Sequence, residues 1–180
     1  RGFHTPRPAD GEPADDGDAR YRESYWAQRP GVWTHGDFAA IDDDGQWFIL
    51  GRSDDTIKVA GKRLGPAEAE NALDADPRVA ECAAVGVPDA VKGDALVLFA
   101  RLVPGTPESE ALRDDLRARV VAALGKALTP RAVYFVDALP KTRNAKVMRR
   151  VIRAAHTGAD VGNTTAIEDP AAIDAIRAAR

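Results

Sequence analysis

The sequence predicts a small α+β domain, and the order of its apolar and helical segments is the reason. Three short apolar runs, at residues 79–87, 95–102 and 132–136, have the length and composition of buried strands. A proline and two early glutamates favour a helix over residues 66–75, and leucines and valines recur every four residues in a second helix that starts at Thr106. Helix, strand, strand, helix and strand in this order indicate helices packed over a sheet.

The chain before this domain predicts a loop followed by a hairpin. Residues 8–18 are rich in proline, glycine and aspartate and are typical of a polar loop, and after them Tyr21 and Tyr25 bring aromatic bulk that needs a packing partner. Residues 38–41 and 47–50 are short apolar runs joined by an Asp-Asp-Asp-Gly turn, whose glycine can adopt a positive φ. We therefore expect a β-hairpin here.

A cluster of positive charge in the segment 139–150 predicts a binding site for an anion. Its cations are Lys141, Arg143, Lys146, Arg149 and Arg150. The pattern becomes helical only from Val147, which predicts that Lys146 lies at a helix N-terminus, where free N–H groups and the helix dipole favour anions. A lysine has no structural need to be there, so a phosphate or carboxylate is the expected partner. A solvated basic loop is the alternative.

Composition excludes several classes of function. The formal net charge of −3 argues against general nucleic-acid binding, which needs a basic excess. The single cysteine, Cys82, excludes an internal disulfide and is expected to pack as a small apolar side chain. The histidines have no metal-ligand spacing, so we expect no metal site among these residues. Without a recognisable signal peptide or membrane-length apolar run, we expect a cytoplasmic protein with neither a membrane nor a nucleic acid as partner.

The segment Leu-Pro-Lys-Thr-Arg-Asn-Ala-Lys at residues 139–146 resembles the C-terminal motif of the adenylate-forming enzymes, which include acyl-CoA synthetases, adenylation domains and luciferases. The resemblance implies that Lys146 contacts the carboxylate and the α-phosphate while an acyl-adenylate forms. The family's usual residue before this lysine is glycine, and here it is Ala145, which makes the loop slightly stiffer.

A second segment, from Gly51 to Glu70, resembles the hinge of the same family and the loop that follows it. Taken alone, it predicts a short strand at residues 56–59, a tight turn and a helix with a solvated charged face that includes Glu68 and Glu70. The resemblance assigns further roles: nucleotide contacts to Arg52 and Arg63, the hinge to Asp54, and the loop beside the pantetheine tunnel for thioester formation to Lys58 and Gly61.

The sequence Thr34-His35-Gly36-Asp37 resembles the family's Thr-Gly-Asp motif, with His35 inserted in the usual pattern. A carboxylate can accept hydrogen bonds from both hydroxyls of a ribose. The resemblance therefore assigns the ATP ribose to Asp37, although most Gly-Asp pairs on their own are turns.

These matches predict the domain organisation. We expect residues 1–53 to be the trailing segment of a large N-terminal adenylation domain that this sequence lacks, and residues 54–157 to be a mobile C-terminal domain. Residues 158–180 are expected to form a tail with a short helix that Asp169 caps and Pro170 begins. The tail looks most like the acetyl-CoA synthetase branch of the family.

The resemblance implies an AMP-forming short-chain acyl-CoA synthetase. Its substrates would be a small carboxylate, ATP with Mg²⁺, and CoA, and its products acyl-CoA, AMP and diphosphate. Because the triphosphate-gripping loop and the acyl pocket belong to the large domain, we expect this chain alone to be inactive. Two alternatives stay open: a stand-alone regulatory or binding domain derived from such a ligase, and a module whose basic loop binds an acidic partner.

Overall fold

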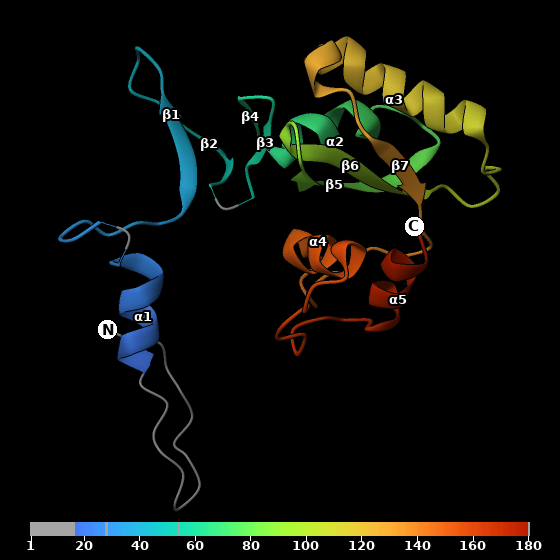
Figure 1. The fold of residues 1–180 in the computed structure, drawn as a ribbon. Helices are drawn as coiled ribbons and strands as arrows, with labels where there is room; N and C mark the ends of the chain where they lie inside the picture. The colour runs from blue at the N-terminus through green and yellow to red at the C-terminus, as the bar shows by residue number, and fades with distance from the viewer. Residues whose placement is uncertain (1–16, 28, 54, 180) are drawn as a thin grey trace, which may run out of the picture. The chain divides into compact units, whose positions relative to one another are not determined.

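The computed structural model describes residues 17–27, 29–53 and 55–179, and it divides into two units, Arg1–Ile49 and Leu50–Arg180 (Figure 1). The predicted hinge residue, Asp54, and most of the predicted N-terminal loop lie outside the described residues. Each unit is described by itself below.

The first unit contains a helix that the sequence did not predict. Helix α1 spans Gly17–Tyr25, so the loop prediction was wrong for Gly17 and Asp18. The rings of Tyr21 and Tyr25 lie 5.4 Å apart, since residues four apart share one face of a helix. The ring of Trp33 stacks on Tyr25 at 5.5 Å. The aromatic side chains therefore pack against one another.

The predicted β-hairpin is confirmed. Strands β1 (Asp37–Ile41) and β2 (Trp47–Arg52) form a two-stranded sheet, and β2 continues into the second unit. In the connecting turn, Asp42 Oδ1 accepts hydrogen bonds from the N–H groups of Asp44 (3.1 Å) and Gln46 (2.8 Å). Gly45 has φ +78°, the positive value for which glycine suits the turn.

The second unit is built on a five-stranded sheet. Its strands are β3 (Ile57–Val59), β4 (Lys62–Leu64), β5 (Val79–Asp89), β6 (Gly93–Leu102) and β7 (Ala132–Phe135). The order is β4-β3-β6-β5, and β7 also pairs with β6. All pairs are antiparallel except β6–β7, which is parallel. The three predicted strands are confirmed, although β5 and β6 run further than expected and shorten the loop predicted between them.

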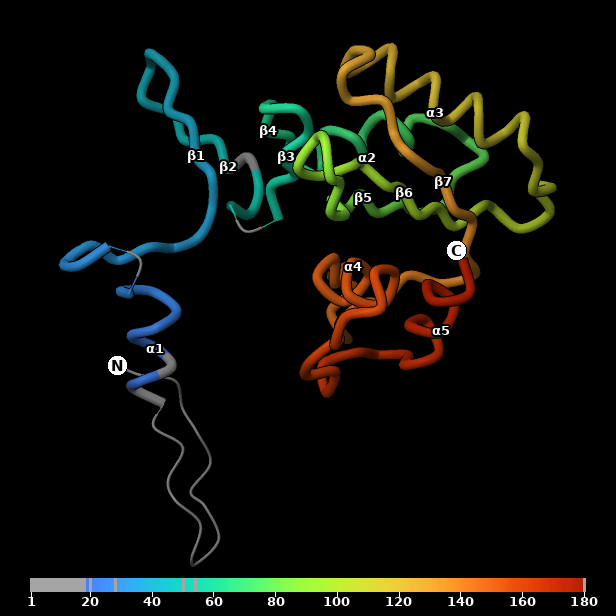
Figure 2. Tube along the Cα trace, viewed as in Figure 1, coloured from blue at the N-terminus to red at the C-terminus, as the bar shows by residue number. Residues whose placement is uncertain are grey.

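Helices cover both faces of the sheet, because its two long strands are apolar on both sides. On β6, Leu96 and Leu98 face one core cluster, while Val97 and Phe99 face the other. The first cluster is closed by α2 (Pro66–Asp74) and α3 (Glu110–Leu124), which is followed by the 3₁₀ turn Lys126–Leu128. The second is closed by α4 (Arg149–Thr157) and α5 (Ala171–Ala178), drawn in orange and red (Figures 1 and 2). The predicted α+β class is confirmed.

The starts of three helices follow their capping groups. Helix α2 begins at the predicted Pro66, and the carboxylate of Glu68 accepts the Gly65 N–H at 2.8 Å. Helix α3 begins at Glu110, four residues after the predicted start at Thr106, because Ser109 caps it and accepts the N–H of Leu112 at 3.1 Å. Helix α5 begins at Ala171 with Pro170 as its N-cap, one residue later than predicted, and Asp169 Oδ1 accepts the Ala171 N–H at 2.9 Å. None of the helices in the described part of the chain is long and apolar enough to cross a membrane.

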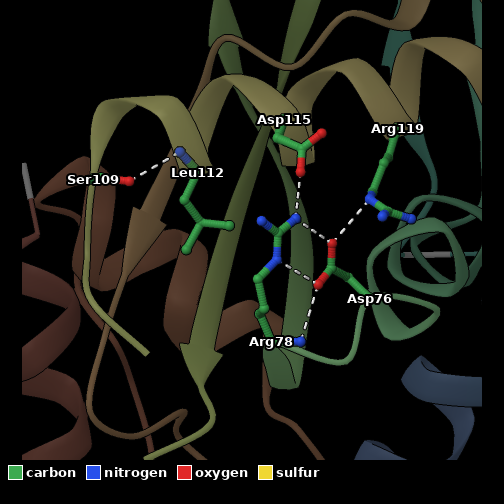
Figure 3. A network of polar contacts seen from close by, with 6 residues as sticks. All are labelled: Asp76, Arg78, Ser109, Leu112, Asp115 and Arg119. Atoms are coloured by element: carbon green, nitrogen blue, oxygen red, sulfur yellow. Dashed lines mark hydrogen bonds and ion pairs between the residues drawn. The ribbon is translucent and has the colours of Figure 1, made fainter. Parts of the chain in front are cut away.

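A buried carboxylate joins the end of α2 to α3 (Figure 3). Asp76 is only 1% exposed and accepts two hydrogen bonds from the Arg78 guanidinium, at 2.8 and 2.6 Å. Arg119 of α3 lies 2.9 Å from the same carboxylate, and Arg78 also pairs with Asp115 of α3. The hydrogen bonds from Arg78 outweigh the effect of burial and lower the pKa of Asp76 to about 2.

Asp76 should therefore give the domain an acid-sensitive component of stability. Its folded-state pKa lies below the ordinary 3.8, so its contribution is present above pH 4 and is lost as the pH falls towards 2. We expect Asp76→Asn to lower the free energy of unfolding by roughly 3 kcal/mol near pH 7, because two arginines lose their partner. Urea unfolding from pH 7 to pH 2 should show this difference shrinking by roughly 2 kcal/mol.

The matched control is Asp114→Asn, which removes an exposed carboxylate from an i,i+3 pair with Arg117 on α3. It should change the free energy of unfolding by less than about 0.5 kcal/mol at every pH. A difference between wild type and Asp76→Asn that stayed constant with pH would contradict the assignment.

Candidate functional site

Lys146 lies in a short hairpin and not at a helix N-terminus. Lys141 and Val147 form an antiparallel bridge, and the carbonyl of Lys146 accepts the Thr142 N–H at 2.9 Å. Helix α4 begins only at Arg149, with Met148 as its N-cap. The prediction that Lys146 stands at the mouth of a helix is therefore wrong, because cross-strand hydrogen bonds hold residues 141–147, named here the lysine hairpin.

The tip of the lysine hairpin contains a residue in the left-handed conformation. Ala145 has φ +58°, and its N–H donates to the Thr142 carbonyl at 2.8 Å. The Thr142 hydroxyl also accepts the N–H of Lys146 at 3.3 Å. A residue with a Cβ pays about 1–2 kcal/mol in this conformation, which glycine adopts freely. The alanine thus occupies a position that suits the family's usual glycine.

One arm of the lysine hairpin is tied to the edge strand β5 by an ion pair. The Lys141 ammonium donates to both carboxylate oxygens of Glu81, at 3.0 and 2.8 Å, and Arg101 donates to the same carboxylate at 2.7 Å. Partial burial alone would raise the pKa of Glu81, but the hydrogen bonds from Lys141 and Arg101 outweigh it and lower the pKa. Lys141 therefore has a structural partner of its own.

The other arm leads directly into a buried ion pair. Arg149 donates to both oxygens of Glu70, at 2.8 and 2.6 Å, and Glu70 also accepts the N–H of Ala84 at 2.9 Å. Glu70 is 8% exposed, so the prediction that it lies on a solvated helix face was wrong. The Arg149 guanidinium also lies 3.6 Å from Asp55, the residue after the predicted hinge.

Sequence reasoning missed Glu70 although a signal was present. The buried residues of α2 are Pro66, Ala69, Glu70 and Leu73, so the glutamate lies within the apolar stripe of its helix. A carboxylate on an apolar stripe needs a buried partner, since an unpaired buried charge is costly.

Lys146 borders an open hollow on the surface of the domain. The hollow has a volume of about 440 Å³ and is lined by Thr142, Arg143, Asn144, Lys146, Thr165 and Ala166. Lys146 and Arg143 are both exposed, so their charged groups are accessible there. The hollow is large enough for part of a small ligand, and its cations suit an anionic one.

The predicted thioester loop is a tight turn between β3 and β4. Ala60 and Gly61 have φ +49° and +80°, as a two-residue hairpin turn requires, and Lys58 pairs across it with Arg63. A Cβ built on Gly61 would meet nothing within 4 Å. The turn alone thus explains the glycine, and the open space around it leaves room for a ligand. Lys58, Gly61 and Arg63 are all exposed and lie on one hairpin, separate from the one that carries Lys146.

The remaining predicted residues lie apart from these two hairpins in the chain. Arg52 is exposed at the end of β2. Asp37 begins β1 in the first unit, and its carboxylate forms an ion pair with His35. The histidine inserted in the family's motif therefore contacts the very carboxylate to which the resemblance assigns the ribose. Within the described residues, no group of three or more His, Cys, Asp or Glu side chains could hold a metal ion.

Comparison with known proteins identifies the class. Residues 68–146, from the first turn of α2 to Lys146, match the family described as the AMP-binding enzyme C-terminal domain. Acetoacetyl-CoA synthetase from Streptomyces lividans superimposes with a TM-score of 0.79 at 26% identity, over 92% of this chain and 25% of that chain. ATP-bound MatB from Rhodopseudomonas palustris gives 0.66 at 28% identity, over 77% of this chain and 27% of that one. This chain carries the C-terminal domain of an adenylate-forming enzyme.

Within that class, the chain matches the C-terminal domain of AMP-forming acyl-CoA synthetases. It is 46% identical over 155 residues to acetyl-coenzyme A synthetase from Pyrobaculum aerophilum, covering 86% of this chain and 23% of the relative. It is 44% identical over 165 residues to 3-hydroxypropionyl-coenzyme A synthetase from Sulfurisphaera tokodaii, covering 92% of this chain and 25% of the relative. The chain thus spans about a quarter of the length of the curated relatives it matches. The resemblance inferred from the motifs is confirmed.

The Glu70–Arg149 pair should be a main source of the domain's stability. We expect Glu70→Gln to lower the free energy of unfolding by roughly 3–5 kcal/mol, because Arg149 keeps its charge in a partly buried place without the partner carboxylate. Glu68→Gln is the matched control on the same helix, since an amide oxygen can still accept the Gly65 N–H. Urea unfolding followed by circular dichroism measures both, and equal losses in the two variants would contradict the role given to Glu70.

Proposed function

We propose that this domain supplies the adenylation lysine and the thioester-forming loop of an AMP-forming carboxylate–CoA ligase. The observation that carries the proposal is the exposed Lys146 on a hairpin fastened at both arms, beside a hollow that Arg143 also lines. A fixed cation of this kind suits a step in which two anions must approach each other. Relatives that are acetyl- and 3-hydroxypropionyl-CoA synthetases support a short-chain carboxylate as substrate.

In the first half-reaction, a carboxylate oxygen attacks the α-phosphorus of Mg-ATP, and pyrophosphate leaves. Lys146 lies near both the carboxylate and the α-phosphate in this proposal and offsets their repulsion. Asp37 holds the ribose, while Arg52 and Arg63 contact the nucleotide. The Mg²⁺ accompanies ATP and is held mainly by the large N-terminal domain.

In the second half-reaction, the thiol of CoA attacks the acyl carbon of the adenylate, and AMP leaves. The turn at Gly61, with Lys58 beside it, then faces the reacting atoms, because the domain has rotated about Asp54. The location of Lys146 and Gly61 on different hairpins supports a change of orientation between the two steps. The ion pair between Arg149 and Asp55 supports a hinge that ends at residue 54, since Asp55 is tied to the body of the domain.

The proposed partner is a large N-terminal adenylation domain. We divide the sequence into residues 1–53, which trail from that domain, the mobile domain 54–157 and the tail 158–180. Large apolar side chains of the β1–β2 hairpin are exposed, among them Trp47 at 70% and Ile49 at 67%, which supports packing against further polypeptide. The buried Cys82 fits a reducing, cytoplasmic setting. We expect the chain by itself not to catalyse either step.

The two half-reactions should separate in variants of a hybrid enzyme, in which this chain replaces the matching residues of the Pyrobaculum aerophilum synthetase. Lys146→Ala should lower acetate-dependent ATP–pyrophosphate exchange by about 10²–10³, because a charge-stabilising donor is lost. Thioester formation from supplied acetyl-AMP should stay near the unsubstituted level. Lys126→Ala, which removes another exposed lysine, should change neither rate.

Gly61→Leu should give the opposite result in the same hybrid, because its side chain would obstruct the thiol. Gly61→Ala is the control for backbone strain, since both substitutions place a Cβ at φ +80° and only leucine adds bulk. Loss of the same half-reaction in Lys146→Ala and Gly61→Leu would refute the proposed division of roles. A hybrid in which Lys146→Ala changed neither reaction would instead favour a non-catalytic domain.

Asp54→Pro tests the hinge. Proline fixes φ near −65° and restricts Ser53 before it, so it should trap one orientation of the domain. We expect one half-reaction to fall by orders of magnitude while the other stays near the unsubstituted rate, with little change in melting temperature. The hinge assignment fails if both rates remain normal or if the variant unfolds.

A further inference from the structure

The C-terminal tail forms hydrogen bonds on both sides of Lys146, with Lys141 before it and with Arg150 after it. We propose that tail residues 161–168 position the lysine hairpin for adenylation and that Arg150 is the positioning residue that holds them. The part of this inference that concerns catalysis rests on the proposed role of Lys146. The part that concerns the conformation of the hairpin does not.

The first attachment comes from the helix that follows the hairpin. The Arg150 guanidinium donates two hydrogen bonds to the tail, one to the Val161 carbonyl at 2.6 Å and one to the Asn163 carbonyl at 3.2 Å. A planar guanidinium donates to two carbonyls at once through N–H groups whose directions are fixed, whereas the N–H groups of an ammonium rotate freely. Arg150 therefore fixes both the place and the direction of the tail as it leaves α4.

The second attachment is to the hairpin itself. The Lys141 carbonyl accepts the N–H of Glu168 at 2.9 Å, and Thr142 forms an antiparallel bridge with Ile167. Thr142 also holds the tip of the hairpin: its N–H and hydroxyl form hydrogen bonds with the backbone of Lys146, and its carbonyl accepts the N–H of Ala145. The tail thus pairs with the first arm of the lysine hairpin through an isolated β-bridge and one further hydrogen bond.

The tail can hold the hairpin because it is itself anchored. Ile167 is 6% exposed, and Ile173 and Ile176 of α5 are 7% and 0% exposed in the core cluster that they share with α4. Just before Ile167, the Asn163 side chain accepts the Thr165 N–H at 2.9 Å. Burying such side chains is worth about 1.5–3 kcal/mol each, so the tail is held firmly on the domain.

The tail also shapes the space in front of Lys146. Thr165 and Ala166 form one wall of the hollow that Lys146 and Arg143 border. A displacement of the tail would therefore move the hairpin and open the hollow at the same time. A misplacement of about 1 Å at a catalytic group can cost about 10² in rate.

Gly162 provides a way to disturb this arrangement without touching Arg150. It has φ +64°, and a Cβ built on it would lie 3.0 Å from a terminal nitrogen of the Arg150 guanidinium. Gly105 has φ +89°, and a Cβ there would meet nothing within 4 Å. An alanine at either glycine has the same kind of backbone strain, but only an alanine at Gly162 pushes on Arg150.

The test compares Arg150→Ala and Gly162→Ala with two matched controls, Arg153→Ala and Gly105→Ala. Arg153 lies one turn further along α4, and its own partner, Asp94, lies 3.6 Å away. In the 180-residue chain, amide hydrogen exchange is measured at Thr142 and Lys146, whose N–H groups bond within the hairpin. Both test variants should speed this exchange at least tenfold, and both controls should leave it unchanged.

In the hybrid enzyme, the same two variants should lower kcat for ATP–pyrophosphate exchange by roughly 10-fold to 100-fold, with little change in the KM for ATP. Thioester formation from supplied acetyl-AMP should not change. Arg150→Lys keeps the charge but loses the two-carbonyl geometry, so it should remain impaired.

The outcomes are distinguishable. Amide hydrogen exchange at the wild-type rate at Thr142 and Lys146 in both test variants would overturn the positioning role. Full adenylation activity in Arg150→Lys would also overturn it, because it would indicate that only the charge of residue 150 matters. If Lys146→Ala leaves adenylation intact, the proposed function fails by itself, and the exchange rates of the isolated chain still decide whether the tail holds the hairpin.

Discussion

The ion pair between Glu70 and Arg149 is the interaction on which the rest of the domain depends. It joins α2 to the start of α4, and through the Ala84 N–H it also joins the edge strand β5. Because Glu70 is 8% exposed, either partner without the other would leave a charge in a place where water cannot solvate it well. The lysine hairpin ends where α4 begins, so the pair that stabilises the core also determines where Lys146 emerges.

The features that the sequence predicted correctly are determined by residues that lie close to one another in the chain. Apart from Glu81 and Arg101, the strands at residues 79–87 and 95–102 are apolar, because helices cover both of their faces in the structure. Pro66 and Glu68 define the start of α2 by steric preference and by a hydrogen bond three residues back along the chain. The turn of the β1–β2 hairpin is specified by Gly45, because glycine adopts a positive φ without steric cost.

The features that were mispredicted depend on partners far away in the chain. From the sequence alone, Glu70 resembles a solvent-exposed glutamate near the start of a helix, because its partner Arg149 is 79 residues distant in the chain. The segment 139–150 has no periodicity that reveals a hairpin, since its shape comes from Thr142 and from residue 168 of the tail. The start of α3 was misplaced for a different reason: both Thr106 and Ser109 are residue types that can cap a helix, and in the structure it is Ser109 that accepts the Leu112 N–H.

The hairpins that carry Gly61 and Lys146 are therefore held in different ways, and this difference has a consequence for the proposed chemistry. The turn at Gly61 has two positive φ values in adjacent residues, and the Ala60 N–H donates to the Lys92 carbonyl at 2.8 Å, in the turn between β5 and β6. The lysine hairpin contains a strained Ala145 and depends on Glu81, Glu70 and the tail for its position. Changes at Glu81, Glu70 or the tail should therefore alter the step proposed for Lys146 and leave the step proposed for Gly61 unchanged, because the two hairpins have different supports.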